Sequence, residues 1–130
     1  MVKTAPMIIV FTIFLFGLVG LSSAQEASTL TTQNQWDERY RRVEYIYGKE
    51  PVRFLKKQVS TLGTGKALCL AAGEGRNAVF LAQQGFEVVA GDISSEGLKK
   101  CALLAQERDV EVKTEMADLA TYDMGHGSTT

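Results

Sequence analysis

The chain has 130 residues, a net charge of −1 at pH 7 and a pI near 5.8. This balance gives no reason to expect a nucleic-acid partner or attraction to an acidic membrane surface, because such partners select basic chains. The only histidine, His126, lies near the C-terminus, and no HExxH, CxxC or Ser/His/Asp arrangement is present. Those absences argue against most hydrolase chemistry.

The N-terminal segment has the layout of a secretory signal peptide. Met7 to Leu21 carries no charge, Lys3 precedes it, and Ser22-Ser23-Ala24 supplies the small residues that a signal peptidase reads. We predict that residues 1–24 are a signal peptide cleaved after Ala24, which implies the secretory pathway and no stable membrane association afterwards. Two alternatives remain open. One is an uncleaved anchor, although the run is shorter than the roughly 20 apolar residues that cross a bilayer. The other is a misassigned start codon on a cytoplasmic protein.

The remaining chain reads as one small domain between two polar ends. Residues 25–33 are rich in Ser, Thr and Gln and predict a flexible linker, and residues 125–130 predict a disordered tail. Between them, residues 34–124 carry the periodic patterns. A first helix is expected over 35–45 with Asn34 as its N-cap, and a second from Pro51 to about residue 62.

Strands and helices then alternate. The apolar runs predict strands at 66–71, 87–91 and 110–114, and the helical patterns between them predict helices at 76–84 and from Ser94 or Ser95 to about 108. A further element is expected to start within 119–124. Because the order is βαβαβ with short links, we predict an α/β, Rossmann-like fold with parallel strands and right-handed crossovers. Cys69 and Cys101 fall on apolar faces, so we interpret both as buried small hydrophobes.

Four polar or glycine positions follow the predicted strands: Gly73, Gly75, Asp92 and Asp118. Ligands of such sheets bind at the carboxyl ends of the strands. Glycine lets a backbone approach a ligand closely, and an acid at the end of the second strand can accept hydrogen bonds from ribose hydroxyls. The pattern predicts a nucleoside-cofactor site. Purely structural roles remain open for these residues. The two glycines would suit a tight turn, Asp92 would suit the cap of a helix, and Asp118 would suit a turn.

Four segments together resemble the tellurite-resistance and thiopurine methyltransferase group of class I S-adenosylmethionine-dependent methyltransferases. They are Trp36–Tyr40 (WDERY), Tyr47–Pro51 (YGKEP), Ala72–Ala82 (AGEGRNAVFLA) and Gly91–Ser94 (GDIS). The resemblance covers residues 35–123. It implies the N-terminal half of a class I methyltransferase fold, with three parallel strands and flanking helices, and a chain truncated after the third strand.

The resemblance also implies S-adenosylmethionine as the cofactor and assigns residues to it. Backbone from Ala71 to Gly75, including Gly73, would pass under the methionine end, and Asp92 would hold the ribose hydroxyls. Arg76 would be able to meet a carboxylate at the helix N-terminus. The residues implied around the adenine are Ile93, Asp118 and Leu119, and those implied on the leader helix as a cover are Trp36, Arg39 and Tyr40. Trp36 and Tyr40 are equally compatible with core packing.

Two positions depart from the family pattern. Cys69 stands where the family usually has an acid in its first strand, so one acceptor near the cofactor's amino group is missing. Ala71 stands where the family has its first loop glycine, and alanine is the smallest replacement that keeps a close approach.

The implied function is methyl transfer to a small-molecule acceptor of the thiol or chalcogen oxyanion type. No catalytic side chain or metal is expected, because the protein mainly supplies positioning in such a displacement. One alternative is a catalytically inactive, truncated fragment that binds the cofactor. A second is a dinucleotide-dependent oxidoreductase, since residues 73–78 also match G-x-G-x-x-A. The two helices predicted before the first strand disfavour that reading.

Overall fold

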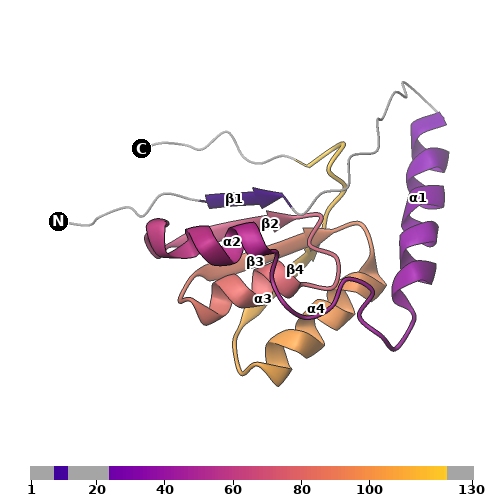
Figure 1. The fold of residues 1–130 in the computed structure, drawn as a ribbon. Helices are drawn as coiled ribbons and strands as arrows, with labels where there is room; N and C mark the ends of the chain where they lie inside the picture. Colours follow the sequence, from indigo (N-terminus) through magenta and orange to yellow (C-terminus); the bar gives the residue numbers. More distant parts are fainter. Residues whose placement is uncertain (1–7, 12–23, 123–130) are drawn as a thin grey trace.

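The computed structural model describes residues 8–11 and 24–122. In this part of the chain, four strands form one parallel sheet in the order β1-β2-β3-β4. The elements are β1 (Ile8–Phe11), α1 (Ala24–Tyr40), α2 (Arg53–Gln58), a 3₁₀ turn η1 (Val59–Thr61), β2 (Lys66–Leu70), α3 (Arg76–Gln83), β3 (Glu87–Asp92), α4 (Ser95–Glu107) and β4 (Val112–Met116). Helices α3 and α4 lie side by side along the sheet, and α1 stands beyond the strand ends (Figure 1).

The α/β, Rossmann-like prediction is confirmed. All three predicted strands and the two helices between them are present, with bounds that differ by no more than two residues from those expected. Both crossovers, β2-α3-β3 and β3-α4-β4, join parallel neighbours. Because the strands follow one another in the same direction across the sheet, right-handed crossovers place α3 and α4 on the same face.

The core lies between that face and the two helices. It includes Ala67 and Cys69 of β2 and Val88 and Ala90 of β3, packed with Cys101 of α4. Leu68 and Leu70, which alternate with them, are buried as well. Burial of both faces of a strand is typical of parallel sheets, and it explains why β2 reads as a continuous apolar run.

The prediction of two buried cysteines is confirmed, and both thiols are free. Burial raises the pKa of Cys69 and of Cys101 to about 12. At pH 8 such a thiol is ionised in roughly one molecule in ten thousand. We therefore expect a disulfide reagent such as dithiobis(nitrobenzoate) to label neither cysteine in the native chain and both in urea. Rapid labelling of either one in the native chain would show that the helix–sheet interface opens.

The strand β1 has no counterpart among the predicted elements. It pairs in parallel with β2, with Ile8 opposite Ala67 and Phe11 opposite Leu70, and it lies inside the segment predicted to be a signal peptide. A short apolar run with β-branched residues fits either a strand or the apolar region of a signal, and periodicity does not separate them. The predicted disordered tail, 125–130, and the last part of the element expected over 119–124 lie outside the described residues.

Helix α1 differs from prediction at both ends. It covers residues 25–33, where a flexible linker was predicted, and it ends at Tyr40 rather than near residue 45. The hydroxyls of Thr31 and Thr32 donate to the carbonyls of Ala27 and Ser28, at 2.9 and 2.8 Å. These bonds satisfy polar side chains within the helix, so the Ser/Thr-rich composition does not break it. No helix in residues 8–11 and 24–122 is both long and apolar enough to span a bilayer.

After α1 the chain crosses α4 and α3 to reach α2 (Figure 1). We call this crossing segment, residues 41–52, the strap. Its last residue, Val52, has an extended backbone and begins α2 as its N-cap. The Val52 amide donates to the Asn77 side chain of α3 at 2.9 Å. Helix α2 therefore starts at Arg53, two residues later than the position of Pro51 suggests, and the residue before it is tied to α3.

Candidate functional site

The strand register brings the predicted site segments to one edge of the sheet. Leu70 lies opposite Gly91, and Asp92 lies opposite Met116. The loop 71–75, residues 92–94 and residues 117–118 therefore leave the sheet side by side. Helix α1 runs along this edge, because Thr29 near its start donates to Asp118 at 3.3 Å and Asp37 near its end accepts from Ser94 at 2.6 Å.

The loop 71–75, called the glycine loop below, turns sharply from β2 into α3. Ala71, Gly73 and Gly75 all have positive φ, at 52°, 56° and 88°. The Gly75 amide donates to the Ala72 carbonyl at 3.0 Å, and Gly75 is the N-cap of α3. The predicted tight turn is present, and the first turn of α3 presents its amides next to it.

Gly75 is required by packing as well as by the turn. A Cβ at this position would lie 2.9 Å from the Cα of Cys101 and closer still to the Cys101 side chain. The backbone of helix α4 therefore packs directly against the backbone of the glycine loop, with no room for a side chain at Gly75. Gly73 has a different neighbour, because a Cβ there would lie 2.8 Å from the Tyr40 hydroxyl oxygen.

Ala71 is the non-glycine residue of the loop that adopts the left-handed region. This conformation costs an L-residue about 1–2 kcal/mol, whereas a new glycine costs about 0.4–1 kcal/mol through the unfolded chain. We expect Ala71→Gly to raise the free energy of unfolding by about 0.5 kcal/mol, measured as a higher urea midpoint. Ala72→Gly, at a buried position outside that region, is the control and should lower the midpoint. If the urea midpoint falls equally in both variants, then the backbone at Ala71 is not strained.

Asp92 is buried at the end of β3 and holds the glycine loop. Its Oδ2 accepts from the Gly73 amide at 2.8 Å and its Oδ1 from the Ser94 amide at 2.8 Å. Burial raises the pKa of Asp92, and the hydrogen bonds from Ser94 and Gly73 oppose that rise. The Ile93 amide is a third donor to this carboxylate. Because two carboxylate oxygens offer about four lone-pair sites, acceptor capacity remains beyond the three amides. The cap of α4 is Ser94, whose Oγ accepts from Gly97 at 3.0 Å.

The three leader-helix residues cluster at the end of α1. Tyr40 is buried, and its ring fits where Gly73 and Gly97 leave room, since a Cβ at Gly97 would meet it at 2.9 Å. Trp36 stacks on Tyr40 with ring centroids 5.6 Å apart, and the Arg39 guanidinium lies 5.3 Å from the Trp36 ring centroid. Burial, followed by the charge of Asp92, raises the pKa of Tyr40, so its hydroxyl stays protonated. Tyr40 is thus buried against α4 at Gly97 and also lies beside the glycine loop at Gly73.

Asp37 was not predicted as a site residue, although it lies within the WDERY motif. It is buried, accepts from the Ser94 hydroxyl at 2.6 Å and from the Glu96 amide at 3.3 Å, and so ties α1 to the start of α4. Its placement one turn before Tyr40 in a helix is the sequence signal that would have placed both on one face.

The residues predicted around an adenine are less enclosed. Ile93 is partly exposed, and Leu119 is 44% exposed. Asp118 accepts from the Ala120 amide at 2.9 Å and from the Thr29 hydroxyl at 3.3 Å. Asp118 therefore closes a turn and also contacts α1, and all three residues follow β3 or β4 at the same edge as Asp92.

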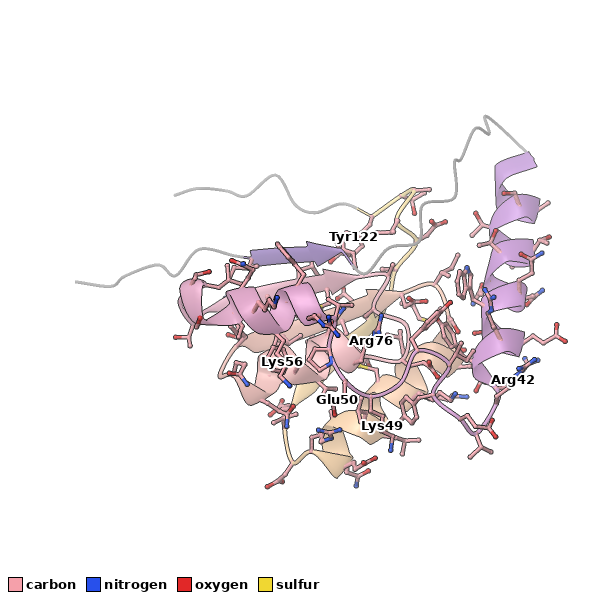
Figure 2. The ribbon with its side chains drawn as sticks, viewed as in Figure 1. Arg42, Lys49, Glu50, Lys56, Arg76 and Tyr122 are labelled. Atoms are coloured by element: carbon pink, nitrogen blue, oxygen red, sulfur yellow. The ribbon has the colours of Figure 1, made fainter. Side chains whose placement is uncertain are left out.

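Arg76 does not point along the edge toward Asp92. Its Nη1 donates to the Tyr47 carbonyl at 2.9 Å, and its guanidinium lies 5.8 Å from the Tyr47 ring centroid. Figure 2 shows Arg76 close to the strap, which also carries the labelled Lys49 and Glu50. In this conformation Arg76 binds the strap and not a ligand carboxylate.

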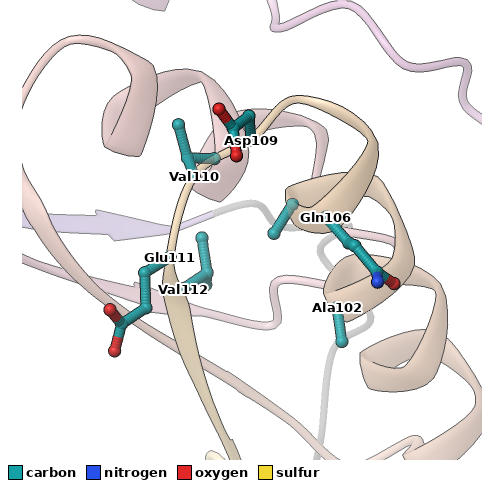
Figure 3. A pocket seen from close by; sticks show the side chains of 7 residues that line it. Ala102, Gln106, Asp109, Val110, Glu111 and Val112 are labelled. Atoms are coloured by element: carbon teal, nitrogen blue, oxygen red, sulfur yellow. The ribbon is translucent and has the colours of Figure 1, made fainter.

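A separate hollow of about 480 Å³ lies on the other side of the domain (Figure 3). It is lined by the C-terminal half of α4 and the start of β4, including Ala102, Gln106, Val110 and Val112. Val112 begins β4 whereas Met116, opposite Asp92, ends it. The hollow is therefore at the amino ends of the strands and is not part of the candidate site.

Comparison with known proteins supports the sequence resemblance. The family model described as "Tellurite resistance protein TehB" matches residues 36–127. No curated protein matches the chain.

A solved structure with a TM-score above 0.5 shares the fold. A structure described as "Conversion of a Disulfide Bond into a Thioacetal Group during Echinomycin Biosynthesis" aligns over 67% of this chain and 39% of its own, with 23% identity and a TM-score of 0.57. Magnesium protoporphyrin IX methyltransferase from Synechocystis PCC 6803, with bound SAH, aligns over 82% of this chain and 44% of its own, with 20% identity and a TM-score of 0.45. The chain thus spans less than half the length of either structure.

Proposed function

Because the chain belongs to the tellurite resistance protein TehB family of S-adenosylmethionine-dependent methyltransferases, we propose that it binds S-adenosylmethionine and supports methyl transfer to a small-molecule acceptor. The observation that carries the proposal is the bond between Asp92 and the Gly73 amide at the carboxyl end of the sheet. It joins the acid suited to a ribose and the loop suited to a close backbone approach into one unit.

We assign the cofactor's parts from the family resemblance, and the position of these residues at one edge of the sheet supports the assignment. The ribose hydroxyls bind the free lone pairs of Asp92, and the methionine end lies along the backbone of Ala71 to Gly75. The adenine lies near Ile93 and the turn at Asp118 and Leu119. Trp36, Arg39 and Tyr40 cover the cofactor from α1. When bound, the cofactor supplies an activated methyl group on a sulfonium, and the chain's own residues orient it and exclude water.

The acceptor is a small soft nucleophile, either a thiol or a chalcogen oxyanion. The tellurite resistance in the family description supports the oxyanion. Methyl transfer is an in-line displacement in which the acceptor's lone pair forms the new bond to carbon, and the sulfonium sulfur leaves with the electron pair of the broken bond. Such a step needs alignment rather than a protein nucleophile.

An assay of methyl transfer tests the proposal. The full chain is incubated with S-adenosylmethionine and either selenite or tellurite with a reductant, or 2-mercaptoethanol, and S-adenosylhomocysteine is measured. Acceptor-dependent product supports the proposal. Cofactor binding without product from any of these acceptors would favour the alternative, an inactive cofactor-binding fragment.

We further infer that residues 1–24 direct the chain to the secretory pathway and are removed there. The uncharged run before Ser22-Ser23-Ala24 supports this. Removal would also take β1 from the edge of β2, which leaves that edge unpaired. A reporter fused behind residues 1–30 tests the proposal. Secretion with a new N-terminus at Gln25 is expected, and a reporter retained in the cytoplasm would contradict it.

A further inference from the structure

Glu74 stands between the two glycines of the glycine loop, where a charged side chain in solvent would be the ordinary expectation. Instead its side chain is 3% exposed. Its Oε2 accepts from the Lys100 ammonium of α4 at 2.7 Å, and its Oε1 accepts from the Tyr47 amide of the strap at 3.4 Å. The side chain thus joins the glycine loop to both a helix and the strap.

Lys100 completes the connection from the other side. Its side chain is 10% exposed, and its Nζ also donates to the Glu44 carbonyl at 2.5 Å and lies 5.2 Å from the Tyr45 ring centroid. The Tyr45 hydroxyl donates back to the Lys100 carbonyl at 2.9 Å. One ammonium therefore binds a loop carboxylate, a strap carbonyl and an aromatic face, which together compensate for its loss of water.

Two further residues of the same motif, Arg76 and Asn77, make contacts with the strap as well. Arg76 donates to the Tyr47 carbonyl, and Asn77, which is buried, accepts from the Val52 amide. All three side chains of the sequence E-G-R-N other than the glycine, those of Glu74, Arg76 and Asn77, thus form hydrogen bonds with the strap.

We propose that Glu74 and Lys100 are positioning residues for the cofactor site. Their buried ion pair holds the strap against the glycine loop and so sets the loop conformation that receives the cofactor. Asp92 fixes the same loop at Gly73, and Glu74, the next residue, fixes it to α4. For its ligand part this inference rests on the proposed function, whereas the contact with the strap does not.

The chemistry favours positioning over plain stabilisation. A buried ion pair is often replaceable by apolar residues of similar volume without loss of stability, while removal of one partner leaves an uncompensated buried charge. The double variant Glu74→Leu/Lys100→Met therefore separates the two roles. It keeps the volume buried, but it cannot accept from the Tyr47 amide or donate to the Glu44 carbonyl.

The experiment uses the full chain with three variants: the double variant, Glu74→Gln, and Glu107→Gln as the matched control. Glu107 accepts from Lys49 of the strap at 2.7 Å, but this pair is exposed, and exposed pairs contribute little. Two quantities are measured: hydrogen exchange of the strap amides, including Tyr47 and Val52, and the affinity for S-adenosylhomocysteine. Urea midpoints monitor folding.

For Glu74→Gln and for the double variant we expect strap exchange to rise and affinity to fall, each by about tenfold or more, because each variant loses at least one hydrogen bond to a charged group. The urea midpoint of the double variant should stay near that of the wild type, and Glu107→Gln should change none of the three quantities. Strap exchange at the wild-type rate in the double variant would overturn the inference, as would a fully retained affinity. A wild-type chain that binds no S-adenosylhomocysteine would overturn the proposed function, and the exchange rates alone would then decide the role of the pair.

Discussion

Substitution of Gly75 by alanine is expected to destabilise the chain by about 2–5 kcal/mol, the sum of two costs. The left-handed backbone, with φ at 88°, costs about 1–2 kcal/mol for an L-residue. The added Cβ would lie 2.9 Å from the Cα of Cys101, and overpacking of this kind costs about 1–3 kcal/mol. Because domains are stable by only about 5–15 kcal/mol, the variant should show a much lower urea midpoint by circular dichroism.

Gly63→Ala is the matched control for this experiment. Gly63 has no positive φ, and a Cβ there would meet nothing within 4 Å. We expect this control to lie within about 0.5 kcal/mol of the wild type. If Gly75→Ala unfolds at the same urea concentration as Gly63→Ala, then α4 does not approach the glycine loop as described.

Replacement of Asp92 by alanine should abolish measurable binding of S-adenosylhomocysteine. Two ribose hydroxyls would each lose a hydrogen bond to a charged group, a loss of about 1.5–3 kcal/mol apiece, and the affinity should fall by more than about 100-fold. The Gly73 amide would also lose its acceptor, so the glycine loop itself becomes less fixed. Calorimetric titration of wild type and variant measures the change. Undiminished affinity in the variant would remove Asp92 from the site.

The pH dependence of stability separates the charge of Asp92 from its hydrogen bonds. Burial raises the pKa of Asp92 above its ordinary value of 3.8, so the folded chain holds the proton more tightly than the unfolded chain. The stability of the wild type relative to Asp92→Asn should therefore be highest below pH 3.8, fall as the pH rises through the raised pKa, and level off above it. A relative stability that rises over this range would mean that hydrogen bonding outweighs burial.

The order of elements and the edge of the candidate site could be predicted from the sequence because they follow from local patterns. Apolar runs such as Ala67 to Leu70 predict buried strands, and the parallel order then brings Asp92 and Asp118 to the same edge. The family match confirms the resemblance carried by the WDERY and AGEGRNA segments. These features need no knowledge of long-range contacts.

The features that sequence reasoning missed depend on contacts between distant residues. Strand β1 exists through its pairing with β2, and α1 extends over the predicted linker while Thr29 reaches Asp118, 89 positions away. The burial of Glu74 could not be predicted, because its partner, Lys100, is brought near only by the packing of α4. Local propensity carries no information about such partners.

Titration of the full chain with S-adenosylhomocysteine by calorimetry, with NAD as the competing candidate, tests the central claim most directly. The account predicts saturable binding of S-adenosylhomocysteine and none of NAD at the same concentration. A folded sample that binds no S-adenosylhomocysteine, or that binds NAD instead, would contradict the assignment of this edge of the sheet to S-adenosylmethionine.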